Sequence, residues 1–349
     1  MEARSSSSSS SATTPALLLL LLAAALHGGD ATPPPVKLAG GARHVAFDEG
    51  YTQMFGDGNL ALLRHGRRVH LTLDESTGAG FASQDVFLHG FFSAAIKLPS
   101  DYAAGVVVAF YLSNGDTYEK THDELDFEFL GNVRGREWRV QTNVYGNGST
   151  AAGREERYDL PFDPSDEFHH YSILWTPHRI IFYVDETPIR EVVRTAEMGA
   201  AFPAKPMAVY ATIWDGSAWA TLGGRYRVNY KYAPFVAEFA DFVLHGCAVD
   251  PSSSAAAVEH SITAAAAARG YEEAAVLSLS TAANRAAMAA FRRGHMSYSY
   301  CHDRRRYPVA LSECAAGGGG DLRRVFGPDG MRYDGRHRRP RRSGRDASS

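Results

Sequence analysis

The sequence predicts an all-β protein in which two antiparallel sheets pack face to face. Runs rich in Val, Tyr and Phe follow one another between residues 43 and 247, with turn residues between them. Helical periodicity is scarce before residue 279. Hydrophobic residues make up 45% of the 349 positions, which is enough to fill a large core. The expected strands lie within residues 67–75, 92–99, 105–113, 125–131, 138–146, 168–190 and 205–214.

A separate segment precedes these strands. The apolar run PALLLLLLAAALHGG, residues 15–29, follows Arg4 and contains a stretch of about a dozen apolar residues, too short for the ~20 that span a bilayer. We therefore expect residues 1–30 to be a signal peptide, with an uncleaved anchor as the alternative. Because a secreted protein meets the glycosylation machinery, we also expect a glycan on Asn147 of the sequon Asn-Gly-Ser.

The stretch HDELDFEFLG, residues 122–131, alternates three acids with large apolar residues. This period of two predicts a strand with one buried face and with Glu124, Asp126 and Glu128 together on the other. Retaining glycosidases use a pair of carboxyl groups, one as nucleophile and one as acid/base. The outer two acids can take these roles, while Asp126 orients the nucleophile and like-charge repulsion raises the pKa of the acid. A calcium site and a merely solvated acidic strand are the rival interpretations.

Two other runs carry side chains suited to sugars. In WRVQTNVY, Gln141 and Asn143 share a polar face, and amides supply both the donor and the acceptor that neutral hydroxyls require. In ATIWDGSAWATLGG, Trp214 and Trp219 lie close together, and indole faces stack on sugar rings. A solvated strand edge for the amides and core positions for the indoles are the alternatives.

The C-terminal third differs from the rest. Residues 250–278, rich in Ala and Ser, are expected to be a variable connection, followed by a helix within 279–295 that Ser280 or Thr281 caps. The total charge is −3, but residues 315–349 hold nine Arg against four acids. We expect this tail to be disordered, with an acidic polysaccharide as a partner; nucleic acid and a tail without function are the alternatives.

Because the chain has three cysteines, one of them must stay free or pair outside the chain. Cys301 and Cys314 are the expected disulfide because they close a short loop in a loop-rich segment. Cys247 is then left over.

The stretch HDELDFEFLG resembles the active-site strand of the plant xyloglucan endotransglucosylase/hydrolases, in glycoside hydrolase family sixteen. QTNVYGNGST, WDGSAWATLGG and SYSYCHDRRRYP resemble the same family, and the likeness covers roughly residues 45–247 and 279–310. It implies a concanavalin-like β-jelly-roll catalytic domain over residues 31–247. A C-terminal extension containing a short helix would follow over residues 248–314.

The resemblance also implies roles for single residues. Glu124 would be the nucleophile, Asp126 its helper and Glu128 the acid/base. Positions that match glucan contacts are Gln141, Asn143, Arg154, Glu155, Trp219, Gly223 and Arg306. Family members usually carry four cysteines in two bridges, and the expected partner of Cys247 is missing here.

The function that follows is that of a xyloglucan:xyloglucosyl transferase, secreted to the cell wall and apoplast. It would cut the β-1,4-glucan backbone with retention and join it to a xyloglucan oligosaccharide or polysaccharide acceptor. An endohydrolase, a wall-binding lectin, and activity on mixed-linkage glucan or cellulose are the alternatives. We expect a monomer with no metal or organic cofactor and with no nucleic-acid or membrane partner.

Overall fold

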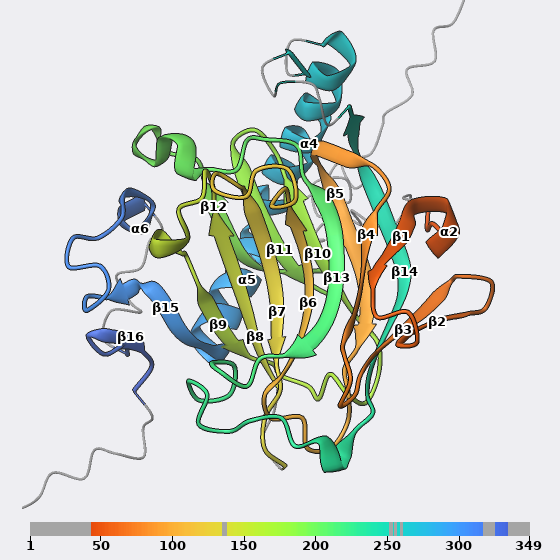
Figure 1. Ribbon diagram of the computed structural model, residues 1–349. Helices are drawn as coiled ribbons and strands as arrows, with labels where there is room; N and C mark the ends of the chain where they lie inside the picture. The colour runs from red at the N-terminus through yellow and green to blue at the C-terminus, as the bar shows by residue number, and fades with distance from the viewer. Residues whose placement is uncertain are drawn as a thin grey trace, which may run out of the picture. The chain divides into compact units, whose positions relative to one another are not determined.

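Two β-sheets face each other in the computed structural model (Figure 1). The structure describes residues 43–134, 138–250, 254, 257–258, 261–316 and 325–333. The expected signal peptide and most of the Arg-rich tail lie outside these residues. Within the described part of the chain, no helix is long and apolar enough to cross a membrane.

The first sheet has the strand order β1-β4-β13-β6-β7-β8-β9-β15-β16. Its strands are β1 (Tyr51–Phe55), β4 (Ala79–Ser83), β13 (Ala208–Asp215), β6 (Val106–Ser113), β7 (Glu124–Leu130), β8 (Arg139–Tyr145), β9 (Glu156–Asp159), β15 (Met296–Asp303) and β16 (Asp329–Met331). The second sheet has the order β12-β11-β10-β5-β14-β3-β2. Its strands are β12 (Thr187–Val193), β11 (Arg179–Val184), β10 (His169–Trp175), β5 (Val86–Lys97), β14 (Phe235–Val249), β3 (Arg68–Leu73) and β2 (Leu60–Leu63). The described helices are α2 (Phe47–Gly50), α4 (Ile262–Ser280), α5 (Ala282–His295) and α6 (Ser312–Ala316), with short 3-10 turns η1 (Thr150–Ala152), η2 (Ala196–Ala201) and η3 (Tyr230–Tyr232).

The core lies between the two sheets, and the side chains that β7 buries in it determine which of its residues face outward. Phe127 and Phe129 are fully buried. The ring of Phe127 meets Phe182 of β11 edge-on at 5.2 Å, and that of Phe129 meets Tyr171 of β10 at 4.6 Å. Because side chains alternate along a strand, the residues between these phenylalanines face outward, away from the second sheet. The all-β sandwich expected from the alternating runs is confirmed.

Helix α4 covers the outer face of the second sheet, on the side opposite the first sheet (Figure 1). Ala275 and Leu279 are buried against Phe91 and Ile181, and the Tyr183 hydroxyl hydrogen bonds Ser278 at 2.6 Å. The expectation of a variable connection over residues 250–278 is therefore wrong from residue 262 onward, where the chain forms helix α4. Alanine is the strongest helix former, and an Ala-rich segment needs only a few apolar side chains to dock on a sheet.

The following helix and the disulfide agree with the sequence. In α5 the Thr281 hydroxyl accepts a hydrogen bond from the Asn284 backbone N–H at 3.1 Å, so the predicted cap is confirmed. Cys301 and Cys314 are joined, with their Cα atoms 5.4 Å apart, and Cys247 is free, as predicted. This extension lengthens the first sheet, because β15 pairs with β9.

Part of the expected disordered tail is ordered. Residues 325–333 form a short hairpin whose strand β16 pairs with β15, and Phe326 is only 5% exposed. The prediction of disorder is wrong for this segment. The prediction rested on composition, and Gly and Arg dominate the tail around the buried apolar residue Phe326.

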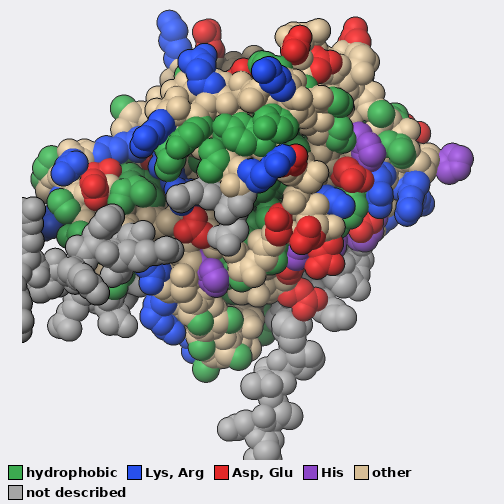
Figure 2. Space-filling model, turned by 90° about the horizontal axis from the view of Figure 1, so that it is seen from below, with side chains coloured by type: hydrophobic (Ala, Val, Ile, Leu, Met, Phe, Trp, Pro, Cys, Tyr) green, Lys and Arg blue, Asp and Glu red, His purple; other side chains and the backbone are tan. Residues whose placement is uncertain are grey.

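The loops at the lower end of the sandwich carry hydrophobic side chains on the surface. Tyr232 of η3 is 42% exposed and stacks on Tyr102 at 5.0 Å. Figure 2, which views this end, shows a band of hydrophobic side chains with Lys, Arg, Asp and Glu interspersed around it. Charges of both signs therefore share this surface.

Candidate active site

The outer face of β7 carries the three predicted acids. Leu125, Phe127 and Phe129 point into the core, so Glu124, Asp126 and Glu128 point outward together. Asp126 is 5% exposed, whereas the two glutamates are half-buried. Crowding of three carboxyl groups on one strand face, in the middle of a sheet, is the arrangement that the alternating sequence predicted.

The neighbouring strand β8 supplies a partner for each acid. Pairing places Tyr145 opposite Glu124, Asn143 opposite Asp126 and Gln141 opposite Glu128. Directly opposed residues share one face of a sheet, so all six side chains lie on the outer surface. The structure thus brings the two predicted amides next to the predicted acids.

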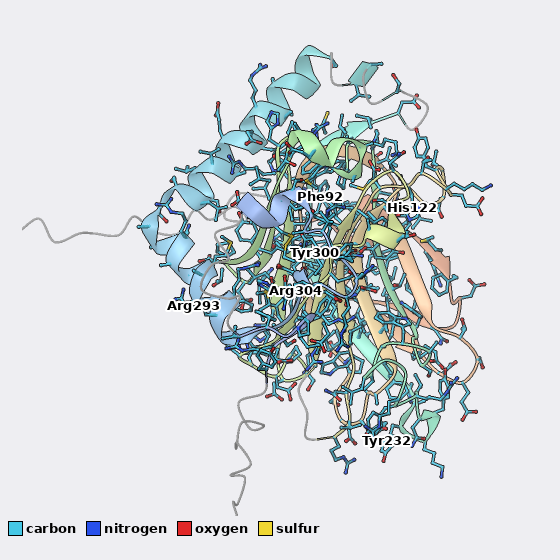
Figure 3. All side chains as sticks on the ribbon, turned by 90° about the vertical axis from the view of Figure 1, so that its left-hand side faces the viewer. Phe92, His122, Tyr232, Arg293, Tyr300 and Arg304 are labelled. Carbon is cyan, nitrogen blue, oxygen red and sulfur yellow. A yellow bond between two sulfur atoms is a disulfide. The ribbon has the colours of Figure 1, made fainter. Side chains whose placement is uncertain are left out.

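Two donors converge on Glu124. The Tyr145 hydroxyl donates to Glu124 Oε1, and Asp126 shares a side-chain hydrogen bond with Glu124. Behind Tyr145, His122 Nε2 lies 3.3 Å from the phenol oxygen. In a side view, His122 lies on the side of the molecule opposite Arg293 of α5 (Figure 3). These contacts fix the orientation of the Glu124 carboxyl group.

The other two acids favour their protonated forms. Burial, with added repulsion from Glu124 and Glu128, raises the pKa of Asp126 well above its ordinary value. Burial likewise raises the pKa of Glu128 to about 7, although the hydrogen bond from Gln141 opposes the rise. Burial and the carboxylates of Asp126 and Glu124 also raise the pKa of Tyr145, which keeps its hydroxyl a donor. Glu128 therefore can carry a proton near neutral pH, as a general acid must.

The amide of Gln141 joins Glu128 to the next strand. Its Nε2 donates to Glu128 Oε2, and its Oε1 accepts from Arg157 Nε at 2.7 Å. Asn143 turns its Oδ1 to two backbone N–H groups, of Val144 at 2.9 Å and of Arg154 at 2.8 Å. Since that oxygen is occupied, the Asn143 amide nitrogen is the atom left to face a ligand.

On the same outer face, aromatic residues lie on the strands that follow β7 on the side away from β8. Tyr111 of β6 lies opposite Asp126, and Tyr210 of β13 lies opposite Tyr111, with the two rings stacked at 5.0 Å. The Tyr210 hydroxyl donates to Asp116 Oδ2 at 2.9 Å. Next to Glu128, by contrast, stands Ala109, whose small side chain leaves room beside the acid.

The predicted tryptophans lie at the lower end of this face. Trp214 lies two positions along β13 from the row of Glu128, and its ring centroid is 6.0 Å from that of Trp219. Both rings pack on Val107 and Leu130 and remain partly exposed. Gly223, in the loop that follows, has a positive φ of 69° with open space around its Cα. The indoles are therefore on the outer, solvent-accessible side of the sheet and not between the sheets.

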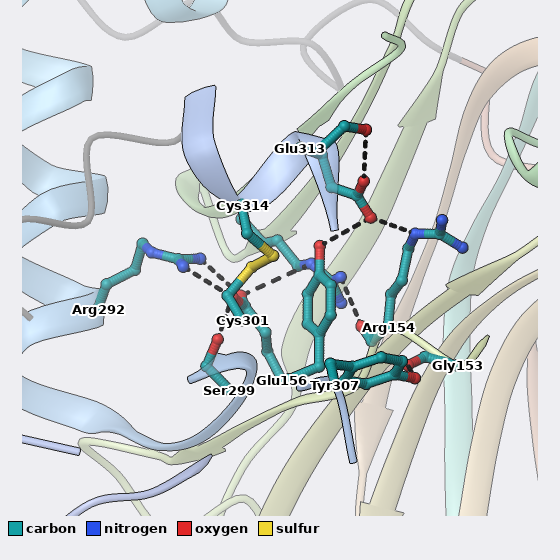
Figure 4. Close-up of a disulfide and its surroundings, with 12 residues drawn as sticks. Gly153, Arg154, Glu156, Arg292, Ser299, Cys301, Tyr307, Glu313 and Cys314 are labelled. Atoms are coloured by element: carbon teal, nitrogen blue, oxygen red, sulfur yellow. Dashed lines mark hydrogen bonds and ion pairs between the residues drawn. A yellow bond between two sulfur atoms is a disulfide. The ribbon is translucent and has the colours of Figure 1, made fainter. Parts of the chain in front are cut away.

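Two ion pairs tie the β8–β9 connection to the C-terminal extension. Arg306 donates to Glu155 Oε2 at 2.6 Å, and both side chains remain partly exposed. Arg154 donates to Glu313 Oε1 at 2.5 Å, and its side chain is only 4% exposed (Figure 4). As placed, Arg154 supports the extension, and it would contact a ligand only if its pair with Glu313 opened.

The disulfide holds this arrangement. Figure 4 shows the bond between Cys301 and Cys314 next to Glu313, the partner of Arg154. The Tyr307 hydroxyl donates to the Gly153 carbonyl at 2.7 Å from within the same loop. Closing the loop that carries Arg306 fixes it against the β8–β9 connection.

A buried charge cluster supports β9 from behind. Glu156 accepts from both terminal nitrogens of Arg292, at 2.6 and 2.7 Å, and lies 3.6 Å from Arg190 Nε. Burial alone would raise the pKa of Glu156, but the two guanidinium groups lower it to about 2. Arg190 also donates to backbone carbonyls of Thr142 and Arg154. This cluster anchors β8, β9 and α5 to one another.

Asp123 fixes the start of β7. Its carboxylate accepts hydrogen bonds from the backbone N–H groups of Asn147, Ala204 and Lys205, and from the Lys205 ammonium at 2.6 Å. The same contact holds the turn of the sequon, and Asn147 is exposed in it. A glycan on this residue is sterically possible and stays a prediction.

Sequence reasoning missed several neighbours of the acids. Tyr145 belongs to the same period-two set as Gln141 and Asn143, but no role at the site was predicted for it. Nothing local marks Arg157 or Tyr111, because strand order decides that these residues adjoin β7. Among the described residues, no group of three or more His, Cys, Asp or Glu side chains is arranged to hold a metal ion.

Comparison with known proteins identifies the family of the chain. The family model described as Glycosyl hydrolases family 16 matches residues 47–232, and that of the Xyloglucan endo-transglycosylase (XET) C-terminus matches residues 273–314. The probable xyloglucan endotransglucosylase/hydrolase protein 28 of Arabidopsis thaliana is 62% identical over 270 residues, which cover 77% of this chain and 79% of that protein. Protein 27 of the same plant and description is 60% identical over 297 residues, covering 85% of this chain and 86% of that protein.

Solved structures show a more distant likeness. A Crh5 transglycosylase in complex with NAG is 24% identical with a TM-score of 0.49, over 64% of this chain and 90% of that one. A prokaryotic β-1,3-1,4-glucanase (lichenase) derived from a mouse hindgut metagenome is 25% identical with a TM-score of 0.46, over 58% of this chain and 98% of that one.

Proposed function

The chain belongs to glycosyl hydrolase family 16, and on that premise we propose that it is a xyloglucan endotransglucosylase that remodels the plant cell wall. It cuts the β-1,4-glucan backbone of xyloglucan and transfers the cut chain to another xyloglucan chain. The observation that carries this proposal is the outer face of β7, where three acids meet the polar residues of β8 in a chain that also carries the family's C-terminal extension.

We propose the following roles for the acids. Glu124 attacks the anomeric carbon of a backbone glucosyl unit while Glu128 donates its proton to the departing glucan oxygen. A covalent bond forms between that carbon and the Glu124 carboxylate as the glycosidic bond breaks. Asp126, whose pKa is raised, keeps a proton and hydrogen bonds Glu124.

In the second step Glu128, now ionised, removes the proton from the 4-hydroxyl of an acceptor chain. The acceptor oxygen bonds to the anomeric carbon, and Glu124 leaves as a carboxylate. Water in place of the acceptor gives hydrolysis. The balance between these products depends on how well bound acceptor displaces water.

We propose that glucan is held by Gln141, Asn143, Glu155, Trp219, Gly223 and Arg306. Arg154 acts through Glu313, because its guanidinium is buried in that pair. The exposed ion pair of Glu155 with Arg306 offers charged hydrogen-bonding groups at the rim.

The chain is proposed to act in the apoplast after loss of a signal peptide, as a monomer. Residues 334–349, with six Arg against two acids, are proposed to hold it on acidic wall polysaccharide. Deleting these residues should reduce retention on pectin at low salt and leave retention at high salt unchanged. Equal retention of the full and shortened chains would contradict this role.

The enzymatic proposal is tested with protein from a secretory host, incubated with xyloglucan and a fluorescent xyloglucan oligosaccharide. Both label incorporation into polymer and new reducing ends are followed, with Glu124→Gln as control. Incorporation that exceeds the reducing ends supports a transferase. Reducing ends without incorporation would make the chain a hydrolase, and neither signal from folded protein would favour a binding protein.

A further inference from the structure

One row of opposed residues crosses every described strand of the first sheet. It contains Phe55, Gly80, Thr212, Ala109, Glu128, Gln141, Arg157, Tyr298 and Met331. Because directly opposed residues share a face, this row marks a line on the outer surface that passes through the proposed acid/base. The line begins at β1 and ends at β16.

The row is continuous in contacts on one side of Glu128. Gln141 donates to Glu128 and accepts from Arg157 at 2.7 Å, as described above. The Arg157 guanidinium lies over the ring of Tyr298, 5.0 Å from its centroid. Met331 of β16 follows Tyr298 by strand pairing. From the acid to the edge of the sheet, the polar side chains of Gln141 and Arg157 are thus followed by Tyr298 and then Met331.

The hairpin that carries Met331 is anchored to the extension. The Arg332 backbone N–H donates to the Ser297 carbonyl at 2.9 Å, and Arg305 N–H donates to the Pro328 carbonyl at 3.1 Å. Phe326 stacks on His302 at 4.7 Å. These bonds and the buried Phe326 give residues 325–333 a defined place beside β15.

Gly330 shows how closely the hairpin fits. Its φ is +70°, and a Cβ built there would lie 2.8 Å from the ring of Tyr298. Only glycine adopts this conformation without strain and leaves that space to the tyrosine ring. The buried ring of Tyr298 therefore fills the space between Arg157 and β16.

The two faces of the hairpin differ. The Arg332 side chain donates to the backbone carbonyls of Arg293 and Met296, on the side of α5. Met331, one residue earlier, is therefore on the opposite face, and Tyr333 shares it by the period of two. Both are exposed, Met331 by 38% and Tyr333 by 60%. Met331 and Tyr333 therefore form an exposed apolar patch at the β16 end of the row, next to Tyr298.

We propose that β16 lengthens the substrate cleft by one strand and that Met331 and Tyr333 bind a sugar ring of the acceptor glucan. At a spacing of about 4.8 Å between strands, β16 lies roughly 19 Å from β7, so a β-1,4-linked chain reaches it only when several backbone units occupy this side. The ligand is a long xyloglucan acceptor. The inference rests on the proposed function.

The acceptor side is assigned by Glu128. This acid protonates the departing chain and later deprotonates the incoming one, so both chains occupy the same side of the cut. Gln141 draws the Glu128 carboxyl toward β8, and the row from β8 to β16 carries the contacts described above. In the opposite half of the row, Ala109 has no polar side-chain atom and the ring of Phe55 covers Gly80, so no comparable series of polar contacts leads away from Glu128 on that side.

Equilibrium binding tests the inference independently of turnover. In a Glu124→Gln background, the double variant Met331→Ser/Tyr333→Ala is compared with its parent for xyloglucan oligosaccharides of one repeat and of several repeats. Loss of a stacking tyrosine is expected to raise Kd for the longer ligand about three- to tenfold, with Kd for the single repeat unchanged. Both residues are exposed at the surface, so the fold is retained, which the melting temperature checks.

The matched control is Met54→Ser/Tyr232→Ala, which removes a methionine and a tyrosine that are 45% and 42% exposed elsewhere. It should leave both Kd values unchanged. Tyr333→Phe keeps the ring and should retain affinity. Unchanged binding of the longer ligand in the double variant, or an equal loss for both ligands, would overturn the proposal.

Kinetics with active enzyme separates this inference from the proposed function. With a xyloglucan-oligosaccharide fluoride as donor, whose departing fluoride leaves the acceptor side empty, the double variant should raise KM for long acceptors and leave KM for the donor unchanged. A change confined to the donor would overturn the assignment of the acceptor side. If the wild-type enzyme transfers nothing while the double variant still loses affinity for the longer ligand only, the proposed function fails and the proposed binding surface stands.

Discussion

Replacing Gln141 with leucine should move the alkaline limit of activity to higher pH. Burial raises the pKa of Glu128 to about 7. The hydrogen bond that the Gln141 amide donates to Glu128 is the largest opposing effect. A hydrogen bond to a charged group contributes about 1.5–3 kcal/mol, and one pKa unit corresponds to about 1.4 kcal/mol. Allowing for water that enters in place of the amide, we expect the pKa of Glu128 to rise by about one unit.

The direction in which the alkaline limb of the pH profile moves follows from the role of Glu128 as the acid. Glu128 must hold its proton for the first step, so kcat/KM falls as pH rises through its pKa. A higher pKa extends the protonated form to higher pH, and the alkaline limb of the profile shifts upward by about one unit. The absolute rate falls at every pH, because Gln141 is also a proposed glucan contact.

The assay is the pH dependence of kcat/KM for transfer, measured for wild type and Gln141→Leu. Thr212→Val is the control, since it alters a residue of the same row that makes no contact with Glu128. Its alkaline limb should coincide with that of wild type. A limb that stays in place or moves downward in Gln141→Leu would refute the assignment of Glu128 as the acid.

Three other changes test the support of the site. Glu156→Gln leaves the buried guanidinium of Arg292 without its charge partner and should lower the free energy of unfolding by about 3–5 kcal/mol; an unchanged denaturant midpoint would contradict the cluster's role. Tyr145→Phe removes one donor to Glu124 and should reduce kcat/KM about tenfold with the melting temperature retained, whereas wild-type kinetics would remove Tyr145 from the mechanism. Cys301→Ser opens a bridge with a sequence separation of 13 and should cost about 3 kcal/mol of stability, a figure that equal melting curves would rule out.

The central strand could be predicted because its information is local. Alternation in residues 124–130 specifies both a strand and the face that its acids share, with no knowledge of neighbouring strands. The same holds for the Thr281 cap of α5, which depends on residues one turn apart. Patterns within a few residues therefore carry both the catalytic array and a helix boundary.

Other features depend on strand order, which no local pattern contains. Tyr111 and Arg157 meet β7 and β8 only because β6 and β9 lie beside them in the sheet. Helix α4 has few large apolar side chains among its alanines, and the docking of Ala275 and Leu279 on the second sheet stabilises it. The ordered hairpin at residues 325–333 rests on one buried phenylalanine within a tail rich in Gly and Arg.

The proposed mechanism requires Glu124 to form the covalent bond to the glycosyl group. The deciding measurement is peptide mass spectrometry of the Glu128→Gln variant after reaction with a xyloglucan-oligosaccharide fluoride. Fluoride leaves without a general acid, and the glycosyl-enzyme breaks down slowly because the variant lacks the general base. We predict a glycosyl adduct on the peptide that contains residues 122–131, located at Glu124. An adduct on a different residue, or none while the wild type transfers label, would contradict the proposed mechanism.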